Sequence, residues 1–203
     1  MDIQHPLSTV VGLGEDVLKR MFLAVEKVRE RLARSTAALD AARVPYAVIG
    51  GNAVAAWVST IDSGAARNTV DVDLMVNRAD LERVKTAMEA AGFVHYELMD
   101  VHMFLDGPNG RPRDAVHLLF AGEKVRQSYS EAAPELTPAA DYSSFKLLDL
   151  EPLVLMKLTS FRDKDRTHLR DMIEVGLLDS SWIKRLPFEL ATRLQELLDN
   201  PDG

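Results

Sequence analysis

Two short segments decide the fold expected of this chain: VIGGNA at residues 48–53 and NTVDVDL at residues 68–74. The first is typical of a buried strand that passes through a Gly50-Gly51 turn into a helix. The second alternates apolar and acidic residues, which indicates a strand. Side chains two positions apart on a strand share a face, so Asp71 and Asp73 are expected to point the same way.

Two neighbouring carboxylates repel each other unless a cation lies between them. Mg²⁺ prefers oxygen ligands of this kind and leaves further positions for substrate phosphates. The backbone N–H groups of a strand–glycine–helix turn suit an anion, and Asn52 is a candidate cap for that helix. The pattern therefore predicts a metal–phosphate site, where cations stabilise the attacking and leaving oxygens of an in-line displacement. The alternative is a half-exposed acidic strand beside an ordinary tight turn, although aspartate is disfavoured in strands.

The rest of the chain predicts alternating strands and helices followed by a helical tail. Apolar residues at spacings of three and four indicate an amphipathic helix over residues 15–42. Short apolar or alternating runs indicate strands, and segments bounded by Pro or Gly indicate further helices. The expected strands are 46–49, 70–76, 93–98, 102–105 and 115–120; the expected helices are 52–59, 80–91, 152–161, 165–175 and 188–198, with a loop over 132–141.

We therefore expect an α/β (α+β) fold, in which helices flank a small mixed sheet. Residues 1–148 are predicted to form the α/β domain with its N-terminal helix, and residues 149–203 a C-terminal helical segment packed on it.

The amino-acid composition excludes some classes of function but does not identify one. The chain has 203 residues, 31 of them acidic and 24 basic, for a formal net charge of −7. This balance disfavours non-specific binding of a long polyanion, although one local basic groove would reverse that expectation. No cysteine is present, which excludes thiolate metal sites and cysteine nucleophiles. Without a long apolar run or a basic N-terminal leader, we expect a cytoplasmic protein with no membrane partner.

The glycine turn and the Asp-x-Asp strand together resemble the DNA polymerase β-like nucleotidyltransferase superfamily. The matching residues are Ile49-Gly50-Gly51 and Asp71-Val72-Asp73, within a resemblance over about residues 44–120. The chain looks closest to small bacterial nucleotidyltransferase-like proteins related to the toxins of abortive-infection systems. The segments MKL at 156–158 and RDKD at 162–165 are similar to the C-terminal helical motif of those proteins.

This sequence departs from the family pattern in two places. Between Gly51 and Asp71 lie 19 residues, more than the family usually has. Family members also carry a third carboxylate on a neighbouring strand, where this chain has His117. The resemblance implies that His117 acts as general base or third metal ligand, and a neutral imidazole can do either. Because imidazole favours Mn²⁺ or Zn²⁺ over Mg²⁺, either the metal preference is altered or the site only binds. A histidine at the edge of the core that bonds to backbone is the structural alternative.

The resemblance implies an enzyme that uses Mg²⁺ or Mn²⁺ to transfer a nucleoside monophosphate from an NTP to a hydroxyl. The acceptor is RNA, a protein side chain or a small molecule. The second hypothesis is a catalytically degenerate module that binds a nucleotide or a partner protein, as in a toxin–antitoxin pair. The expected catalytic and metal-binding residues are Asp71, Asp73 and His117, and the expected nucleotide-binding residues are Gly50, Gly51, Asn52, Arg67, Lys157 and Lys164.

Arg67 and the two lysines have simpler alternatives as solvated surface side chains. His168 and Asp171 are interpreted as an i,i+3 surface pair on a helix.

Overall fold

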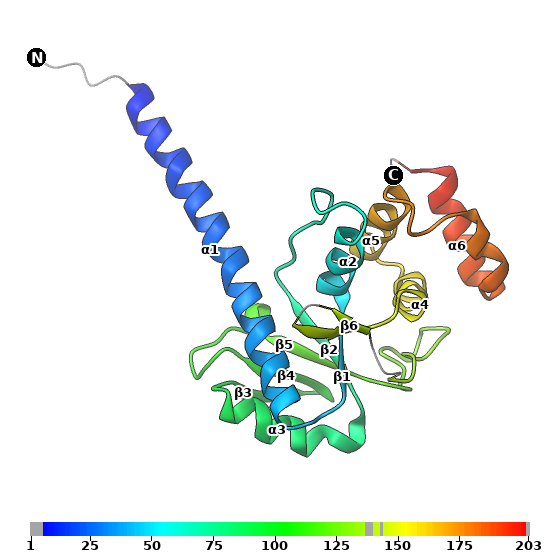
Figure 1. The fold of residues 1–203 in the computed structure, drawn as a ribbon, viewed down its shortest axis with the longest axis horizontal. Coiled ribbons are helices and arrows are strands. Elements are labelled where there is room, and N and C mark those ends of the chain that lie inside the picture. The colour runs from blue at the N-terminus through cyan, green and yellow to red at the C-terminus, as the bar shows by residue number, and fades with distance from the viewer. Residues whose placement is uncertain (1–5, 137–139, 143, 202–203) are drawn as a thin grey trace, which may run out of the picture.

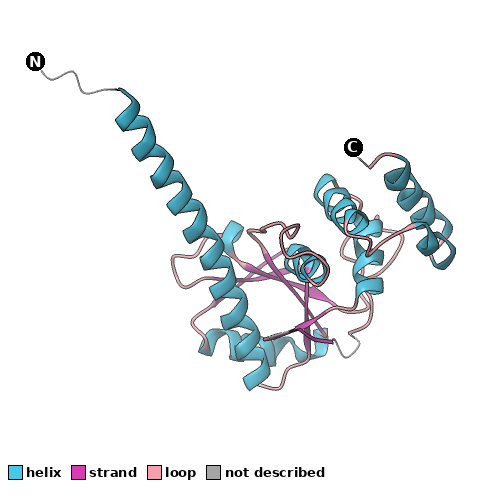
Figure 2. Ribbon diagram, turned by 45° about the horizontal axis from the view of Figure 1, so that its top comes forward, coloured by secondary structure: helices cyan, strands magenta, loops and turns pink. Residues whose placement is uncertain are grey.

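A mixed β-sheet with helices on both faces organises the chain (Figures 1 and 2). The computed structural model describes residues 6–136, 140–142 and 144–201. Within them, seven strands pair in the order β3-β4-β5-β2-β1-β7-β6. The pairs β2–β5 and β1–β7 are parallel, and the remaining pairs are antiparallel. The strands are β1 (Tyr46–Ile49), β2 (Val72–Val76), β3 (Val94–Leu98), β4 (Val101–Leu105), β5 (Val116–Phe120), β6 (Ala140–Tyr142) and β7 (Phe145–Leu147).

Side chains along the central strands alternate between the two faces of the sheet, so the hydrophobic core has two layers. Residues 46 and 48 of β1 and residues 72, 74 and 76 of β2 face α1 and α3. The intervening residues 47, 49 and 75 face α2 and the C-terminal helices. The helices are α1 (Pro6–Ala41), α2 (Gly50–Ser59), α3 (Leu81–Ala90), α4 (Leu150–Ser160), α5 (Asp163–Glu174) and α6 (Phe188–Asp199), with short 3-10 helices at Arg78–Asp80, Pro112–Asp114 and Ser180–Arg185.

The α/β fold, the mixed sheet and the C-terminal helical segment are confirmed. One hydrophobic cluster contains residues of β1, α2, α4, α5 and α6, and within it α4 and α5 pack against α2 and against each other. The predicted loop over 132–141 is wrong at its end, because β6 and β7 form a hairpin on the outer side of β1. These strands have three residues each, which is too short for alternation to mark them in a sequence.

The amphipathic helix α1 is longer than predicted, and only its C-terminal part is covered. Its residues Val28 and Leu32 are buried in the layer shared with α3. Earlier in the same stripe, Leu18, Met21 and Phe22 are more than 60 % exposed. Figure 1 shows this half of α1 projecting beyond the sheet. Within the described ranges, no helix is both long and apolar enough to cross a membrane.

Candidate active site

A cavity of about 400 Å³ lies on the α2 side of the sheet, where the two segments that decide the fold meet the C-terminal helices. Its polar wall comes from the β1–α2 turn, the approach to β2, and helices α4 and α5. The polar lining residues are Asn68, Thr69, Asp71, Asp73, Glu131, Lys157, Thr159, Ser160, Arg162, Lys164, Asp165 and His168, together with Gly50 and Gly51 of the turn. An apolar wall of the same cavity includes Leu119, Val125, Tyr129, Ala133, Leu153 and Met156.

The glycine turn is built around the carboxylate of Asp73. Gly50 has φ +68°, a left-handed conformation that L side chains rarely adopt. A Cβ atom at Gly50 would lie 2.0 Å from Oδ2 of Asp73. One at Gly51 would lie 2.8 Å from Oγ1 of Thr69. Both glycines are therefore required by close approach, and α2 begins at Gly50, earlier than predicted.

The two predicted carboxylates line the same cavity, although only Asp73 belongs to a strand. β2 begins at Val72, so Asp71 immediately precedes it, contrary to the prediction of a strand from residue 70. The predicted cap role of Asn52 is also wrong. Its side chain makes no cap; the Nδ2 atom donates to the backbone oxygen of Asp71 at 2.7 Å. Asn52 does not line the cavity and instead fixes the backbone that carries Asp71.

His117 lies beside Asp73, as the parallel pairing of β2 and β5 requires. The two residues are register partners, and Nδ1 of His117 is 3.9 Å from Oδ1 of Asp73. The imidazole does not line the cavity itself. Across the described part of the chain, Asp71, Asp73 and His117 do not bring three ligand atoms within 4.8 Å of one another. The imidazole of His117 therefore lies close to the carboxylate of Asp73 but not to that of Asp71.

Burial raises the pKa of Asp73, and the charges of His117 and Lys157 oppose this rise. No hydrogen bond to this carboxylate is found among the residues that the structure describes. A partly buried carboxylate without a donor is costly unless a cation approaches it. Asp71 and Asp73 together therefore fit a divalent cation, with room in the cavity for other ligands.

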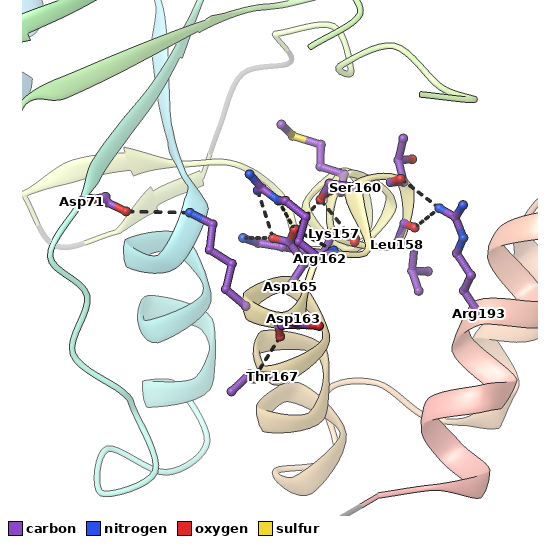
Figure 3. Close-up of polar contacts among 12 residues, drawn as sticks. Asp71, Lys157, Leu158, Ser160, Arg162, Asp163, Asp165, Thr167 and Arg193 are labelled. Atoms are coloured by element: carbon purple, nitrogen blue, oxygen red, sulfur yellow. Dashed lines mark hydrogen bonds and ion pairs between the residues drawn. The ribbon is translucent and has the colours of Figure 1, made fainter. Parts of the chain in front are cut away.

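An ion network whose members line the cavity joins α4 to α5 (Figure 3). Nζ of Lys157 donates to Oδ1 of Asp165 at 3.1 Å, and both side chains are buried. Nε of Arg162 and Oγ of Ser160 donate to Oδ2 of Asp165 at 2.8 Å and 2.7 Å. Burial alone would raise the pKa of Asp165, but Arg162, Lys157 and Ser160 lower it to about 2.

The alternative interpretation of Lys157 as a solvated surface side chain is wrong, because only 6 % of the residue is exposed. Burial lowers its pKa, while the charges of Asp165 and Asp73 raise it. Lys164 is half-exposed, and its Nζ lies 3.8 Å from Oδ2 of Asp71. Both lysines line the cavity from the C-terminal helices, and the charges of both act on Asp73.

Arg67 does not line the cavity, so its position gives no support to the predicted nucleotide contact. Its Nε donates to both carboxylate oxygens of Asp171, at 2.8 Å and 2.9 Å. Asp171 is buried, so this pair ties the loop before β2 to α5. The interpretation of His168 and Asp171 as a surface pair is therefore wrong. α5 turns both side chains toward the molecule instead of toward solvent.

His168 is a cavity residue that the sequence reasoning missed. Its Cε1 lies 3.5 Å from the position that a Cβ of Gly51 would take. Its Nδ1 is buried and has no partner among the described residues. Burial and the nearby charge of Lys157 lower its pKa to about 4, so the ring is neutral at pH 7. Arg162 and Ser160 were also missed as lining residues; the RDKD motif is the signal that covers Arg162.

A second cavity, about 610 Å³ in volume, lies between α1 and the loop before β5. Val70 lines both cavities, so the two are neighbours along the approach to β2. Six basic and three acidic residues line the second one: Arg20, Lys27, Arg31, Arg34, Arg111 and Arg113, with Glu30, Asp106 and Asp114. Arg31 and Arg34 pair with Asp106, and Arg111 and Arg113 pair with Asp114. Arg20 and Lys27 have no ion-pair partner within the described ranges, so they carry the basic excess that would reverse the expectation against nucleic acid.

Comparison with solved structures identifies the fold. The antibiotic-resistance factor ANT(2'')-Ia matches 89 % of this chain and 92 % of its own at 11 % identity, with a TM-score of 0.50. An antigenic nucleotidyltransferase-like protein from Paracoccidioides brasiliensis matches 87 % of this chain and 90 % of its own at 18 % identity, also with a TM-score of 0.50. No known family model and no protein of curated function matches the sequence.

At these identities the likeness concerns the fold. The chain shares its fold with the antibiotic-resistance factor and the nucleotidyltransferase-like protein, and this is the fold expected from the glycine turn and the Asp-x-Asp segment.

Proposed function

We propose that this protein is a metal-dependent nucleotidyltransferase that moves a nucleoside monophosphate from an NTP to a hydroxyl group. One observation carries the proposal: a single cavity gathers the Gly50-Gly51 turn, Asp71, Asp73, Lys157 and Lys164. Each is a group that a nucleotide with its metal ion needs, and they come from three separate parts of the chain. The fold that this chain shares with the two solved structures also supports a nucleotidyltransferase function.

In the proposed reaction, the acceptor oxygen forms a bond to the α-phosphorus, and the bond from this phosphorus to the bridging oxygen of the β-phosphate breaks. Pyrophosphate leaves, and a base takes the proton of the acceptor hydroxyl. Asp71 and Asp73 would hold a divalent cation, which would supply charge stabilisation to the attacking and leaving oxygens. Lys157 and Lys164 offset charge on the triphosphate, and the turn at Gly50-Gly51 offers backbone N–H groups to it.

The apolar wall supports a place for the nucleoside. Tyr129 offers an aromatic ring, and Leu153 and Met156 offer apolar surface in the same cavity as the charged residues. A base and sugar on this wall would leave the phosphates toward Asp71 and Asp73. Ligand sites of this kind combine an apolar lining with a few placed polar groups.

The resemblance implies a role for His117 as third ligand or general base, although its ring does not line the cavity. Its 3.9 Å approach to Asp73 supports a role beside that carboxylate. We expect His117→Asp, which restores the residue type of the family, to shift the preferred metal from Mn²⁺ toward Mg²⁺ because carboxylates suit Mg²⁺ better than imidazole does. Rates with each ion test this, with His117→Gln as the variant that offers neither charge nor a basic nitrogen.

The test of the proposed function is transfer of label from α-³²P-NTPs, with Mg²⁺ or Mn²⁺, to RNA, protein and small hydroxyl acceptors. We expect labelled product from the natural chain and a loss of at least about 100-fold in Asp71→Asn and Asp73→Asn. Asp16→Asn, an exposed change on α1, is the matched control and should retain activity. Nucleotide binding without transfer under any condition would favour the degenerate binding module, for which the histidine at position 117 is the supporting observation.

A further inference from the structure

Three potential metal ligands meet on the opposite face of the sheet from the cavity. His95 and Glu97 lie two residues apart on the edge strand β3, and Glu97 is the register partner of His102 on β4. One ligand atom from each lies within 4.8 Å of the others. None of the three lines the candidate active site. We propose that these residues form a second metal site, which binds a zinc-like transition ion at the β3–β4 edge.

The distances between ligand atoms fit such an ion. In a tetrahedral zinc site with metal–nitrogen bonds near 2.05 Å, neighbouring ligand atoms are about 3.3 Å apart. Nε2 of His95 and Nδ1 of His102 are 3.2 Å apart. Oε2 of Glu97 is 3.7 Å from the same Nδ1. Small movements of the half-exposed Glu97 side chain would complete a three-ligand set, with the fourth position open to water.

A second carboxylate holds His102 in the required orientation. With Nδ1 directed at the cluster, Nε2 of His102 lies 3.4 Å from Oδ1 of Asp100. A ligating histidine commonly directs its other ring nitrogen to a carboxylate in this way, which fixes the ring and strengthens the ligand. Asp100 is itself held by two hydrogen bonds from Arg78, at 3.0 Å and 3.1 Å.

The hairpin turn that supplies Asp100 also fixes the register of the ligands. Met99 and Asp100 both have positive φ, as the two central residues of a type I′ turn require. A hairpin with this turn pairs Leu98 with Val101, and hence Glu97 with His102. His102 is almost fully buried, with its ring edge against Phe120 at a centroid distance of 5.3 Å. Backbone and packing therefore place the ligands before any metal binds.

The ligand chemistry selects the class of ion. Two imidazoles and one carboxylate suit Zn²⁺ and its neighbours in the transition series, whereas Mg²⁺ prefers oxygen ligands and water. The proposed active-site ion rests on Asp71 and Asp73, so the two sites differ in ligands as well as in position. The edge site does not depend on the proposed transferase activity.

The test measures Zn²⁺ binding to the full chain, freed of any affinity tag and of metal, in an Asp71→Asn/Asp73→Asn background that removes the other site. Titration calorimetry is expected to give one equivalent of Zn²⁺ and no response to Mg²⁺. Co²⁺ in place of Zn²⁺ should give the visible absorption of a four-coordinate ion. In the same background, His95→Gln should weaken Zn²⁺ binding by at least about 100-fold, and Asp100→Asn by about 10- to 100-fold.

Glu97→Gln is the conservative test of the third ligand, and Glu151→Gln on α4 is its matched control. The first should weaken binding by at least about tenfold, and the second should leave it unchanged. His95 and Glu97 are not fully buried, so these variants are expected to fold. Absence of Zn²⁺ binding, or binding that His95→Gln does not weaken, would show that His95 and His102 form only a hydrogen-bonded pair and would overturn the proposal.

Discussion

Asp73 is the residue on which the candidate active site depends, because three separate constraints meet at its carboxylate. The left-handed Gly50 gives it space, His117 lies beside it, and burial raises its pKa. The sequence could predict the first relation, since a Gly-Gly turn followed by Asp-x-Asp is a recognisable pattern. It could not predict how close Asp73 lies to Gly50, because that distance follows from the antiparallel pairing of β1 with β2.

Alanine substitutions at two glycines should distinguish the effect of backbone strain on stability from an effect on nucleotide transfer. Gly92→Ala should lose about 1–2 kcal/mol of stability because its φ is positive, and Gly50→Ala should lose more because a collision with Asp73 adds to the same backbone strain. A Cβ at Gly92 meets no atom within 4 Å, whereas one at Gly50 collides with Asp73. Nucleotide transfer should therefore fall by more than about tenfold only in Gly50→Ala. Chemical denaturation and the transfer assay, run on both variants, check this; equal activity in the two would contradict it.

His168 predicts a pH dependence of stability. Its pKa is about 4 in the folded chain and near the ordinary 6.5 in the unfolded chain. Between these values only the unfolded chain binds the proton, so the free energy of unfolding decreases as pH falls from 6.5 to 4. The loss should be on the order of 1–3 kcal/mol.

Urea denaturation at pH 7.5, 6.5, 5.5 and 4.5 measures this effect as the difference between the natural chain and His168→Gln, which keeps a neutral polar group. Asp73 titrates in both proteins and cancels in the comparison. Asp165, with a pKa of about 2, loses its contribution only below the ordinary range of aspartate, outside this window. Parallel curves for the two proteins would refute the assignment to His168.

At the scale of the elements, the periodic segments were predictable and the tertiary relations between them were not. β1 was expected at its observed bounds, and α4, α5 and α6 within two residues of theirs. The sequence gives no sign that α5 turns His168 and Asp171 inward, because that face is polar and is buried through the Arg67 ion pair. The apolar stripe on α1 predicts burial along its whole length. Met21 and Phe22 continue this stripe, yet no described residue covers them.

The junction of α4 and α5 predicts what its buried ion pair contributes. Asp165→Asn should cost about 3–5 kcal/mol, because it leaves the Lys157 ammonium buried with its main partner removed. The double variant Lys157→Met/Asp165→Leu should recover most of that stability while nucleotide transfer stays lost. Glu26→Gln, which breaks an exposed pair with Arg29, should cost less than about 1 kcal/mol. If the double variant retained activity, Lys157 would have only a structural role.

For the whole molecule, the arrangement of charge matters more than its sum. The chain carries a net charge of −7, yet the cavity next to the candidate active site has twice as many basic as acidic lining residues. Arg31 is buried there, and its Nη1 has no partner among the described residues. Because Val70 lines both cavities, an anionic acceptor that lay over Val70 would contact the basic cavity with one part and place its hydroxyl in the candidate active site with another. RNA is therefore the acceptor class to test first.

Charge reversal in the basic cavity therefore tests the acceptor class. Arg20→Glu/Lys27→Glu should raise KM for an RNA acceptor by about tenfold at low salt and flatten its salt dependence, because fewer phosphates are neutralised. Lys19→Glu/Lys184→Glu makes the same change in net charge outside the cavity and should have little effect. Transfer kinetics over a range of salt concentrations compare the two. Equal losses would mean that overall charge alone governs the encounter. No loss in either would direct the search to a neutral acceptor, since a neutral molecule gains nothing from the arginines and lysines of this groove.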